Sequence, residues 1–163
     1  MSRNADDVDA GMMRPRQKPL IVIAEDNDDT RRVYGLILRH FGYEVEEATT
    51  GEDAVELIRH VQPNLALLDI GLPKLDGWQV SQILKTDPAT RGIPLIAFSA
   101  YVNSTADLAG STAFDGFILK PISPTELARR IDGYLRMVTT KTRRSARYSE
   151  RFEQHLSGSE SQL

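Results

Sequence analysis

Acidic side chains follow two apolar runs of this sequence, at the points where the runs end. Glu25 and Asp26 come directly after Leu20–Ala24, and Asp69 comes directly after Leu65–Leu68. Short apolar runs bounded by turn residues are typical of strands buried on both faces of a parallel sheet. Three carboxylates brought together would repel one another, and a hard divalent cation such as Mg²⁺ would neutralise them. The pattern therefore predicts a metal site built from these three acids.

Two more polar side chains occupy equivalent positions later in the chain. Ser99 ends the apolar run 94–98, and Lys120 directly follows the run Gly116–Leu119. The carboxyl ends of parallel strands lie at one edge of the sheet, where open α/β folds place their ligands. We therefore expect the hydroxyl and the ammonium group to converge with the three carboxylates, with Lys120 adding a second positive charge beside them.

Strand-like and helix-like segments alternate along the chain. Strands are expected at residues 20–24, 43–48, 65–68, 94–98 and 116–119, and residues 102–110 are a weak helix candidate. The apolar residues expected on the inner face of the first helix are Val33, Leu36, Ile37 and Phe41. Those expected on the inner face of the last helix are Leu127, Ile131, Tyr134 and Leu135. This alternation predicts an α/β fold with a doubly wound five-stranded parallel sheet in the order 2-1-3-4-5.

Composition limits the classes of protein that fit. The 163 residues, 40% of them hydrophobic, suit one domain with tails, and a net charge of −3 gives no sign of a nucleic-acid partner. Without cysteine there are no disulfides or thiolate metal sites, and no apolar run approaches the roughly 20 residues of a membrane span.

Residues 1–18 lack the apolar core of a signal peptide, so we expect a flexible leader and a cytoplasmic protein. Residues 137–163 are expected to be a solvated, partly basic tail, with a docking or membrane-surface segment as the alternative.

Taken together, these residues resemble the receiver domain of two-component response regulators, over residues 19–136. The matching motifs are Glu25-Asp26, Asp69 in Leu-Leu-Asp-Ile-Gly-Leu-Pro with Asp76-Gly77 after it, Ser99-Ala100 and Lys120-Pro121. Each motif alone is a weak signal, but their order and their places at the strand ends make the set specific. The resemblance implies a flavodoxin-like receiver fold and a stand-alone member of the family, since no output domain follows.

The resemblance also implies roles for individual residues. Asp69 would be the phosphoacceptor, taking a phosphoryl group from a histidine kinase or a histidine phosphotransfer protein. Mg²⁺ would be held by Asp26, Asp69, the Gly71 carbonyl and, through water, Glu25. The nucleophile Asp69 would thus also be a ligand of the metal.

Three further residues would act on the phosphoryl group or respond to it. Lys120 and the Ser99 hydroxyl would contact the phosphoryl oxygens, and Phe117 would be the switch aromatic coupled to Ser99, with a plain core position as its alternative. Such a receiver is a signalling protein rather than an enzyme, with self-catalysed phosphoryl transfer and slow autodephosphorylation. It would act through protein–protein contacts on a downstream target that the sequence does not name.

Two other functions stay open on the sequence alone. A haloacid-dehalogenase-type phosphohydrolase also uses an aspartate nucleophile and Mg²⁺, but it needs a second aspartate where this chain has Gly71. A receiver-like binding module would work without phosphorylation, although degenerate receivers usually lose the aspartate or lysine that this chain has at positions 69 and 120. Departures from the family pattern are Ser99 for the commoner threonine, Gly71 and Tyr101 beside the path of the hydrolytic water, and Ala113-Phe114 for the usual Gly-Ala.

Overall fold

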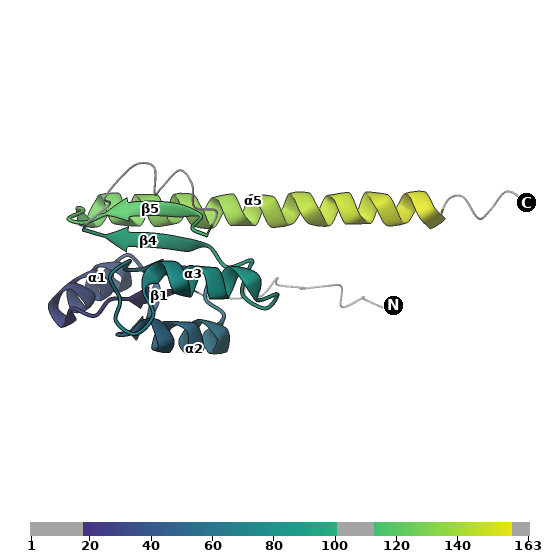
Figure 1. The fold of residues 1–163 in the computed structure, drawn as a ribbon. Helices are drawn as coiled ribbons and strands as arrows, with labels where there is room; N and C mark the ends of the chain where they lie inside the picture. Colours follow the sequence, from purple (N-terminus) through teal and green to yellow (C-terminus); the bar gives the residue numbers. More distant parts are fainter. Residues whose placement is uncertain (1–17, 101–112, 158–163) are drawn as a thin grey trace, which may run out of the picture.

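Five parallel strands form one sheet in the order β2-β1-β3-β4-β5, which confirms the predicted topology (Figure 1). The computed structural model describes residues 18–100 and 113–157, with side-chain surroundings for residues 18–100 and 113–140. The strands are β1 Leu20–Ala24, β2 Glu44–Ala48, β3 Leu65–Leu68, β4 Leu95–Ser99 and β5 Gly116–Leu119. The helices are α1 Asp28–His40, α2 Gly51–Val61, α3 Gly77–Thr86 and α5 Pro124–Ser157. The weak helix candidate at 102–110 and the leader up to residue 17 lie outside the described residues.

Helices cover both faces of the sheet. Strand side chains alternate between the two faces, so neighbours in β1 belong to different clusters: Val22 packs with α2 and α3, and Ile23 packs with α1 and α5. The central strands β1, β3 and β4 are almost entirely buried, as expected for strands covered on both sides. Helices thus pack on both faces of the strands whose carboxyl ends carry the predicted site.

Side chains in the loops start the helices by accepting hydrogen bonds from their free backbone N–H groups. These capping residues are Asn27 for α1, Thr50 for α2, Asp76 for α3 and Ser123 for α5. The α3 cap is reciprocal, because Gln79 also accepts from the backbone N–H of Asp76. The caps of α1 and α3 lie in the loops that carry the predicted acids, so they fix where those loops end.

The buried face of α1 differs from the predicted one. Three of the four residues expected to face inward are 39–66% exposed: Val33, Leu36 and Phe41. The buried residues are instead Tyr34, Gly35 and Leu38, and the Tyr34 ring packs edge-on against Phe98 of β4 with 4.7 Å between ring centroids. Apolar residues on both sides of this helix satisfy the helical spacing, so contact with the sheet decides which side is buried.

Helix α5 is much longer than predicted and runs for 34 residues to Ser157, well past the sheet (Figure 1). The expected end near Arg136 rested on the loss of apolar periodicity, which reports packing rather than helix formation. Residues 137–157 contain no glycine or proline and many good helix formers, so the backbone continues as a helix where the apolar pattern stops. The segment expected to be a solvated tail therefore continues α5 as far as Ser157.

Candidate functional site

The carboxyl ends of β1, β3, β4 and β5 lie side by side at one edge of the sheet. The backbone N–H of Asp69 donates to the Ala24 carbonyl at 3.0 Å, and that of Lys120 donates to the Ser99 carbonyl at 3.0 Å. These bonds continue the strand pairing by one residue at each place. The edge therefore brings together the side chains predicted for the site: Glu25, Asp26, Asp69, Ser99 and Lys120.

Three carboxylates meet at this edge. Glu25, Asp26 and Asp69 each offer one carboxylate oxygen, and the three oxygens lie within 4.8 Å of one another. Glu25 is only 2% exposed, whereas Asp26 is open to solvent, so water can reach the cluster from one side. Closely spaced carboxylates with access for water are the ligands that Mg²⁺ prefers. The donor set therefore fits the predicted metal.

Lys120 places a positive charge in the site. Its ammonium group donates a hydrogen bond to Glu25, lies 3.5 Å from Asp69 Oδ2 and sits 5.2 Å from the centre of the Phe98 ring. Burial raises the pKa of Glu25 above its usual range, and the hydrogen bond from Lys120 opposes that rise. The Lys120–Pro121 peptide is cis. Lys120 thus supplies positive charge directly beside the acids.

A tight loop after β3 holds Asp69. The Gly71 N–H donates to Asp69 Oδ1 at 3.2 Å, so a backbone group orients one carboxylate oxygen. Gly77 donates its N–H to the Ile70 carbonyl at 3.0 Å, and a Cβ at this glycine would come within 2.5 Å of the Asp69 carbonyl oxygen. Only glycine permits this close approach. Gly77, part of the Asp-Gly pair quoted from the sequence, therefore fixes the path of the chain that follows Asp69.

The two residues predicted as a switch lie on neighbouring strands. Ser99 is buried at the end of β4, and Phe117 is half-buried in β5. The Phe117 ring packs with Phe114 and Trp78 at centroid distances of 5.7 and 6.3 Å, and Phe114 meets Trp78 at 5.0 Å. The Ala113-Phe114 departure from the family pattern thus fills the space beside the switch position with an aromatic ring. Tyr101 and residues up to 112 lie outside the described residues.

Sequence reasoning missed two residues that contact the site. Arg31, in the first turn of α1, donates to the Glu25 backbone carbonyl at 2.9 Å, and Phe98 presents its ring to Lys120. The sequence pattern places Phe98 only in a buried strand. Arg31 follows Glu25 by six residues, but this spacing does not reveal that its side chain turns back to the Glu25 carbonyl.

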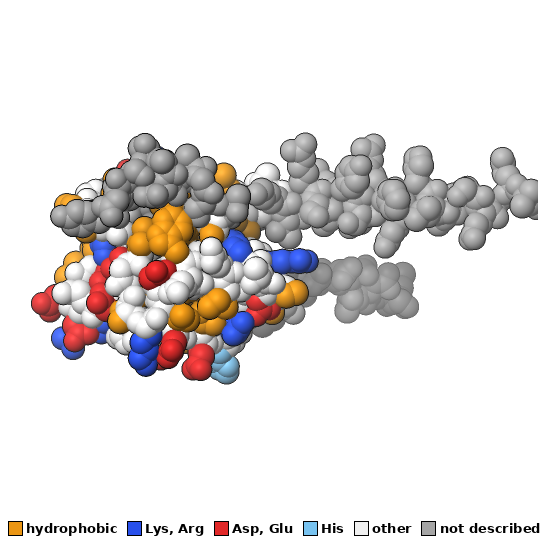
Figure 2. Space-filling model, in the orientation of Figure 1, with side chains coloured by type: hydrophobic (Ala, Val, Ile, Leu, Met, Phe, Trp, Pro, Cys, Tyr) orange, Lys and Arg blue, Asp and Glu red, His pale blue; other side chains and the backbone are white. Residues whose placement is uncertain are grey.

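The face of the domain drawn in Figure 2 is mixed in charge. On the face drawn in Figure 2, acidic and basic side chains are interspersed over the coloured part of the domain, without one continuous basic patch. Within the part of the chain that the structure describes, none of the helices is long and apolar enough to cross a bilayer.

The sequence and the fold match a known protein family. A family model described as "Response regulator receiver domain" matches residues 21–132. Among curated relatives, "Polar-differentiation response regulator DivK" of Brucella ovis is 32% identical over 116 residues, which are 71% of this chain and 94% of DivK. "Probable transcriptional regulator ycf27" of Porphyridium aerugineum is 36% identical over 123 residues, 75% of this chain and 50% of that protein. The chain thus spans about half the length of the ycf27 relatives that it matches.

Solved structures of receiver domains are similar to this chain. A CheY-like response regulator receiver domain protein from Methanospirillum hungatei has a TM-score of 0.70 and 27% identity, covering 76% of this chain and 98% of that chain. The receiver domain of a sensor histidine kinase from Pseudomonas aeruginosa has a TM-score of 0.67 and 26% identity, covering 72% of this chain and 98% of that chain. That structure holds a magnesium ion in its active-site cleft.

Proposed function

The chain belongs to the response regulator receiver family of two-component signalling, and we propose that it is a phosphorylation-dependent switch whose acceptor is Asp69. The phosphoryl donor is the phosphohistidine of a histidine kinase or a histidine phosphotransfer protein, in the cytoplasm. The phosphorylated form acts on its downstream target through protein–protein contacts. One observation carries the proposal: Asp69 meets two further carboxylates and the Lys120 ammonium group at the carboxyl edge of the sheet.

The surroundings of Asp69 suit a carboxylate nucleophile. Its Oδ1 accepts from the Gly71 N–H at 3.2 Å, and its Oδ2 lies 3.5 Å from Lys120 Nζ, so the two oxygens have different partners. In the transfer, an Asp69 oxygen forms a bond to phosphorus as the bond from phosphorus to the donor imidazole nitrogen breaks. The nitrogen keeps the electron pair of that bond and then takes up a proton. The product is an acyl phosphate on Asp69.

Charge neutralisation is the main task of the remaining residues. Phosphoryl transfer depends on positioning and on stabilising charge at the phosphoryl oxygens. Lys120 and the Ser99 hydroxyl are assigned to two of these oxygens. Mg²⁺ would be held by Asp26, Asp69, the Gly71 carbonyl and, through water, Glu25, and would supply further positive charge. The magnesium ion in the related Pseudomonas aeruginosa receiver supports this assignment.

The signal is proposed to pass from Ser99 to Phe117. Both lie on adjacent strands, with Ser99 paired to Leu119, two residues after Phe117. Phe117 is half-buried against Trp78 and Phe114, so a change in its position would alter the surface formed by these rings. This coupling would convert occupancy of the phosphoryl site into a different protein-binding surface.

The phosphohydrolase alternative lacks its second aspartate. A Cβ at Gly71 would have Asp69 Oδ1 as its nearest neighbour at 4.0 Å, so the position has room for a side chain, but the chain supplies no acid there. Without that general acid we expect a stoichiometric adduct rather than rapid turnover.

Phosphorylation by a small phosphodonor tests the proposal. With acetyl phosphate and Mg²⁺, the wild-type chain should gain one phosphoryl group, measured by intact-protein mass or by separation on a phosphate-affinity gel. Asp69→Asn, which is nearly isosteric, should fold and remain unlabelled. Asp53→Asn, a change at an exposed acid in the first turn of α2, is the matched control and should label normally. Full labelling of folded Asp69→Asn would overturn the assignment, and continuous release of phosphate would support the hydrolase.

A further inference from the structure

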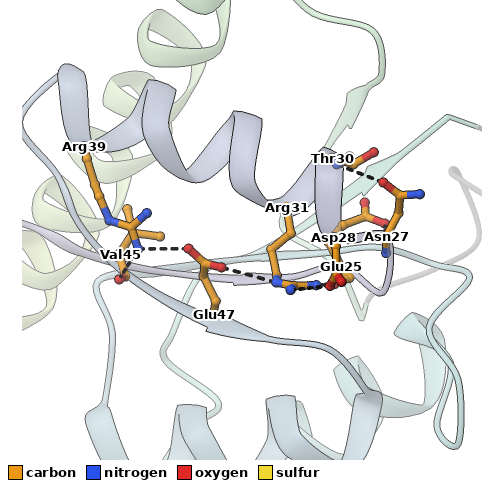
Figure 3. A network of polar contacts seen from close by, with 8 residues as sticks. All are labelled: Glu25, Asn27, Asp28, Thr30, Arg31, Arg39, Val45 and Glu47. Carbon is orange, nitrogen blue, oxygen red and sulfur yellow. Dashed lines mark hydrogen bonds and ion pairs between the residues drawn. The ribbon is translucent and has the colours of Figure 1, made fainter.

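Arg31 connects three elements around the acidic site, as Figure 3 shows. Its Nη1 donates to the backbone carbonyl of Glu25 at 2.9 Å, its Nε donates to Glu47 Oε2 at 3.2 Å, and its Nη2 donates to Asp28 Oδ1 at 2.6 Å. Glu47 belongs to β2, and Asp28 begins α1. The Arg31 side chain is 11% exposed. All three guanidinium nitrogens are thus engaged within a nearly buried group.

The acceptor on Glu25 is the oxygen of the peptide unit that joins Glu25 to Asp26. The N–H of Glu25 donates to the Ala48 carbonyl at 3.0 Å, so the strand network holds one side of the residue. Sheet pairing ends at this N–H, and the Glu25 carbonyl accepts its hydrogen bond from Arg31 instead of from a strand. Because the peptide unit is planar, fixing this carbonyl restricts rotation of the whole Glu25–Asp26 peptide plane. The orientation of that plane sets the direction in which the Asp26 side chain leaves the backbone. The N–H of Asn27 donates to Glu25 Oε1 at 3.1 Å, which tightens the same turn.

Glu47 of β2 holds the Arg31 guanidinium group through its carboxylate. Its Oε1 accepts from Arg39 Nη2 at 2.9 Å while its Oε2 accepts from Arg31. Arg39 also donates to the Val45 carbonyl at 3.1 Å. Figure 3 shows Glu47 lying between the two arginines along α1. Arg39 therefore shares the carboxylate of Glu47 with Arg31 but does not reach Glu25.

We infer that Arg31 is a positioning residue for the metal site: it clamps the Glu25–Asp26 peptide so that the carboxylates of Glu25 and Asp26 are held in place for Mg²⁺. The inference rests on the metal site of the proposed function and adds a residue to it. Groups that orient metal ligands from outside typically change metal affinity by 10–100-fold when removed. The planar fork of arginine suits this task, because one rigid group serves three acceptors from different elements.

The sign of the effect separates positioning from simple electrostatics. A positive charge near three carboxylates opposes the binding of another cation. If Arg31 acted only through its charge, its removal would tighten Mg²⁺ binding. If Arg31 positions the ligands, its removal weakens Mg²⁺ binding in spite of the lost repulsion.

Magnesium affinity of the full chain is the test, measured without any phosphodonor by isothermal titration calorimetry with MgCl₂. Arg31→Met should weaken Mg²⁺ binding about tenfold, and Arg31→Lys, which keeps the charge but loses the fork, should also bind Mg²⁺ more weakly than wild type. Arg39→Met is the matched control: it loses an ion pair to the same Glu47 but leaves the Glu25 carbonyl untouched, so its affinity should equal that of wild type. In NMR spectra of the metal-free protein, the amide signals of Asp26 and Asn27 should shift in Arg31→Met and stay in place in Arg39→Met.

The outcomes distinguish the two proposals. Unchanged or tighter binding in Arg31→Met would overturn the positioning role while leaving the metal site intact. Equal weakening in Arg39→Met would also overturn it, because the effect would then reflect general loosening of α1 and β2. No binding by wild type would instead refute the metal site itself. Should Arg31→Met fail to fold, the comparison of Arg31→Lys with Arg39→Met decides the question.

Discussion

The Lys120 ammonium group donates a hydrogen bond to the buried carboxylate of Glu25 while lying 3.5 Å from Asp69 Oδ2. Lys120 therefore neutralises part of the charge of the acidic cluster before any metal binds. Its side chain is 11% exposed, and the Phe98 ring lies beside it, so the cation is held between the two acids. Metal and lysine thus compete for the same negative charge.

Replacing Lys120 tests this competition. Lys120→Met should bind Mg²⁺ more tightly, by about threefold or more, because a competing positive charge is gone. The same variant should accept phosphate about 10²-fold more slowly, since one donor to the developing phosphoryl charge is lost. Calorimetry and the rate of labelling by acetyl phosphate measure the two effects. Lys74→Met, at an exposed lysine of the loop before α3, should change neither, and parallel losses in affinity and rate for Lys120→Met would contradict the competition.

Removing one metal ligand should abolish stabilisation by magnesium. Only the folded chain brings Asp69 beside Glu25 and Asp26, so Mg²⁺ at a hundredfold excess over its dissociation constant should stabilise the folded state by about 2.7 kcal/mol. In Asp26→Ala the melting temperature should no longer rise with Mg²⁺, measured by circular dichroism at several concentrations. Asp29→Ala, at an exposed acid of the first turn of α1, should respond like wild type. A normal response in Asp26→Ala would place the metal elsewhere.

Strand pattern and strand order were predictable, because buried runs and alternation with helices leave few topologies. The convergence of Glu25, Asp69 and Lys120 followed from that order alone. The buried face of α1 was not predictable, since the choice depends on the packing of Tyr34 against Phe98 of β4 on one face of the sheet. The clamp of Arg31 on Glu25 was also beyond the sequence, because side-chain direction at a helix start is set by partners such as Glu47 on a distant strand.

Trp78 should report the state of Phe117. It is the single tryptophan of the chain, and its ring lies 6.3 Å from Phe117 and 5.0 Å from Phe114. If Phe117 moves when the phosphoryl site is filled, the surroundings of the indole change and its emission shifts. Addition of beryllofluoride with Mg²⁺ should therefore change the fluorescence of wild type, and Phe117→Leu should remove most of that change.

A second variant separates Phe117 from its neighbour in the same aromatic group. Phe114→Leu keeps Phe117 and should retain a fluorescence response to beryllofluoride, although the starting spectrum will differ. An identical response in wild type and Phe117→Leu would show that Phe117 is a plain core residue and not part of the switch.

The hydrogen bond from Tyr43 to Asp132 should stabilise the domain in a pH-dependent way. Tyr43 Oη donates to Asp132 Oδ1 at 2.5 Å and joins the start of β2 to α5. Burial, and then the neighbouring Asp132 carboxylate, raise the pKa of Tyr43 above its ordinary value of 10.0. Tyr43→Phe should lower the free energy of unfolding by about 1.5–3 kcal/mol at neutral pH, since the acceptor is charged.

The sign of the pH effect follows from the raised pKa. From neutral pH up to pH 10 the phenol is protonated in both the folded and the unfolded chain, so the contribution of Tyr43 is constant. Above that pH the unfolded chain releases the proton while the folded chain keeps it, and the stability supplied by Tyr43 falls. Urea unfolding should therefore show the gap between wild type and Tyr43→Phe narrowing as the pH rises from about 10 to 11. A constant gap over this range would mean that the phenol is not held neutral by folding.

The distal part of α5 should be dispensable for folding and phosphorylation. Leu127 and Ile131 are fully buried and Tyr134 packs against Gly116, where a Cβ would come within 2.3 Å of the phenol oxygen. Beyond these contacts Met137 is already 65% exposed. A chain of residues 19–140 should therefore unfold within about 1 kcal/mol of the full chain and accept phosphate at the same rate.

Shorter chains locate the point at which α5 becomes necessary. A chain ending at residue 136 loses Met137 and Val138, which line a groove with Pro94 and Tyr134; it should still fold and accept phosphate, with a stability loss of about 1–2 kcal/mol. A chain ending at residue 130 lacks Ile131 and should not fold, because a fully buried core residue is missing. Circular dichroism and phosphate labelling measure all three chains. Insolubility or strong destabilisation of the 19–140 chain would mean that residues beyond 140 pack on the domain, and the extension of α5 would then be part of the folded receiver rather than an appendage to it.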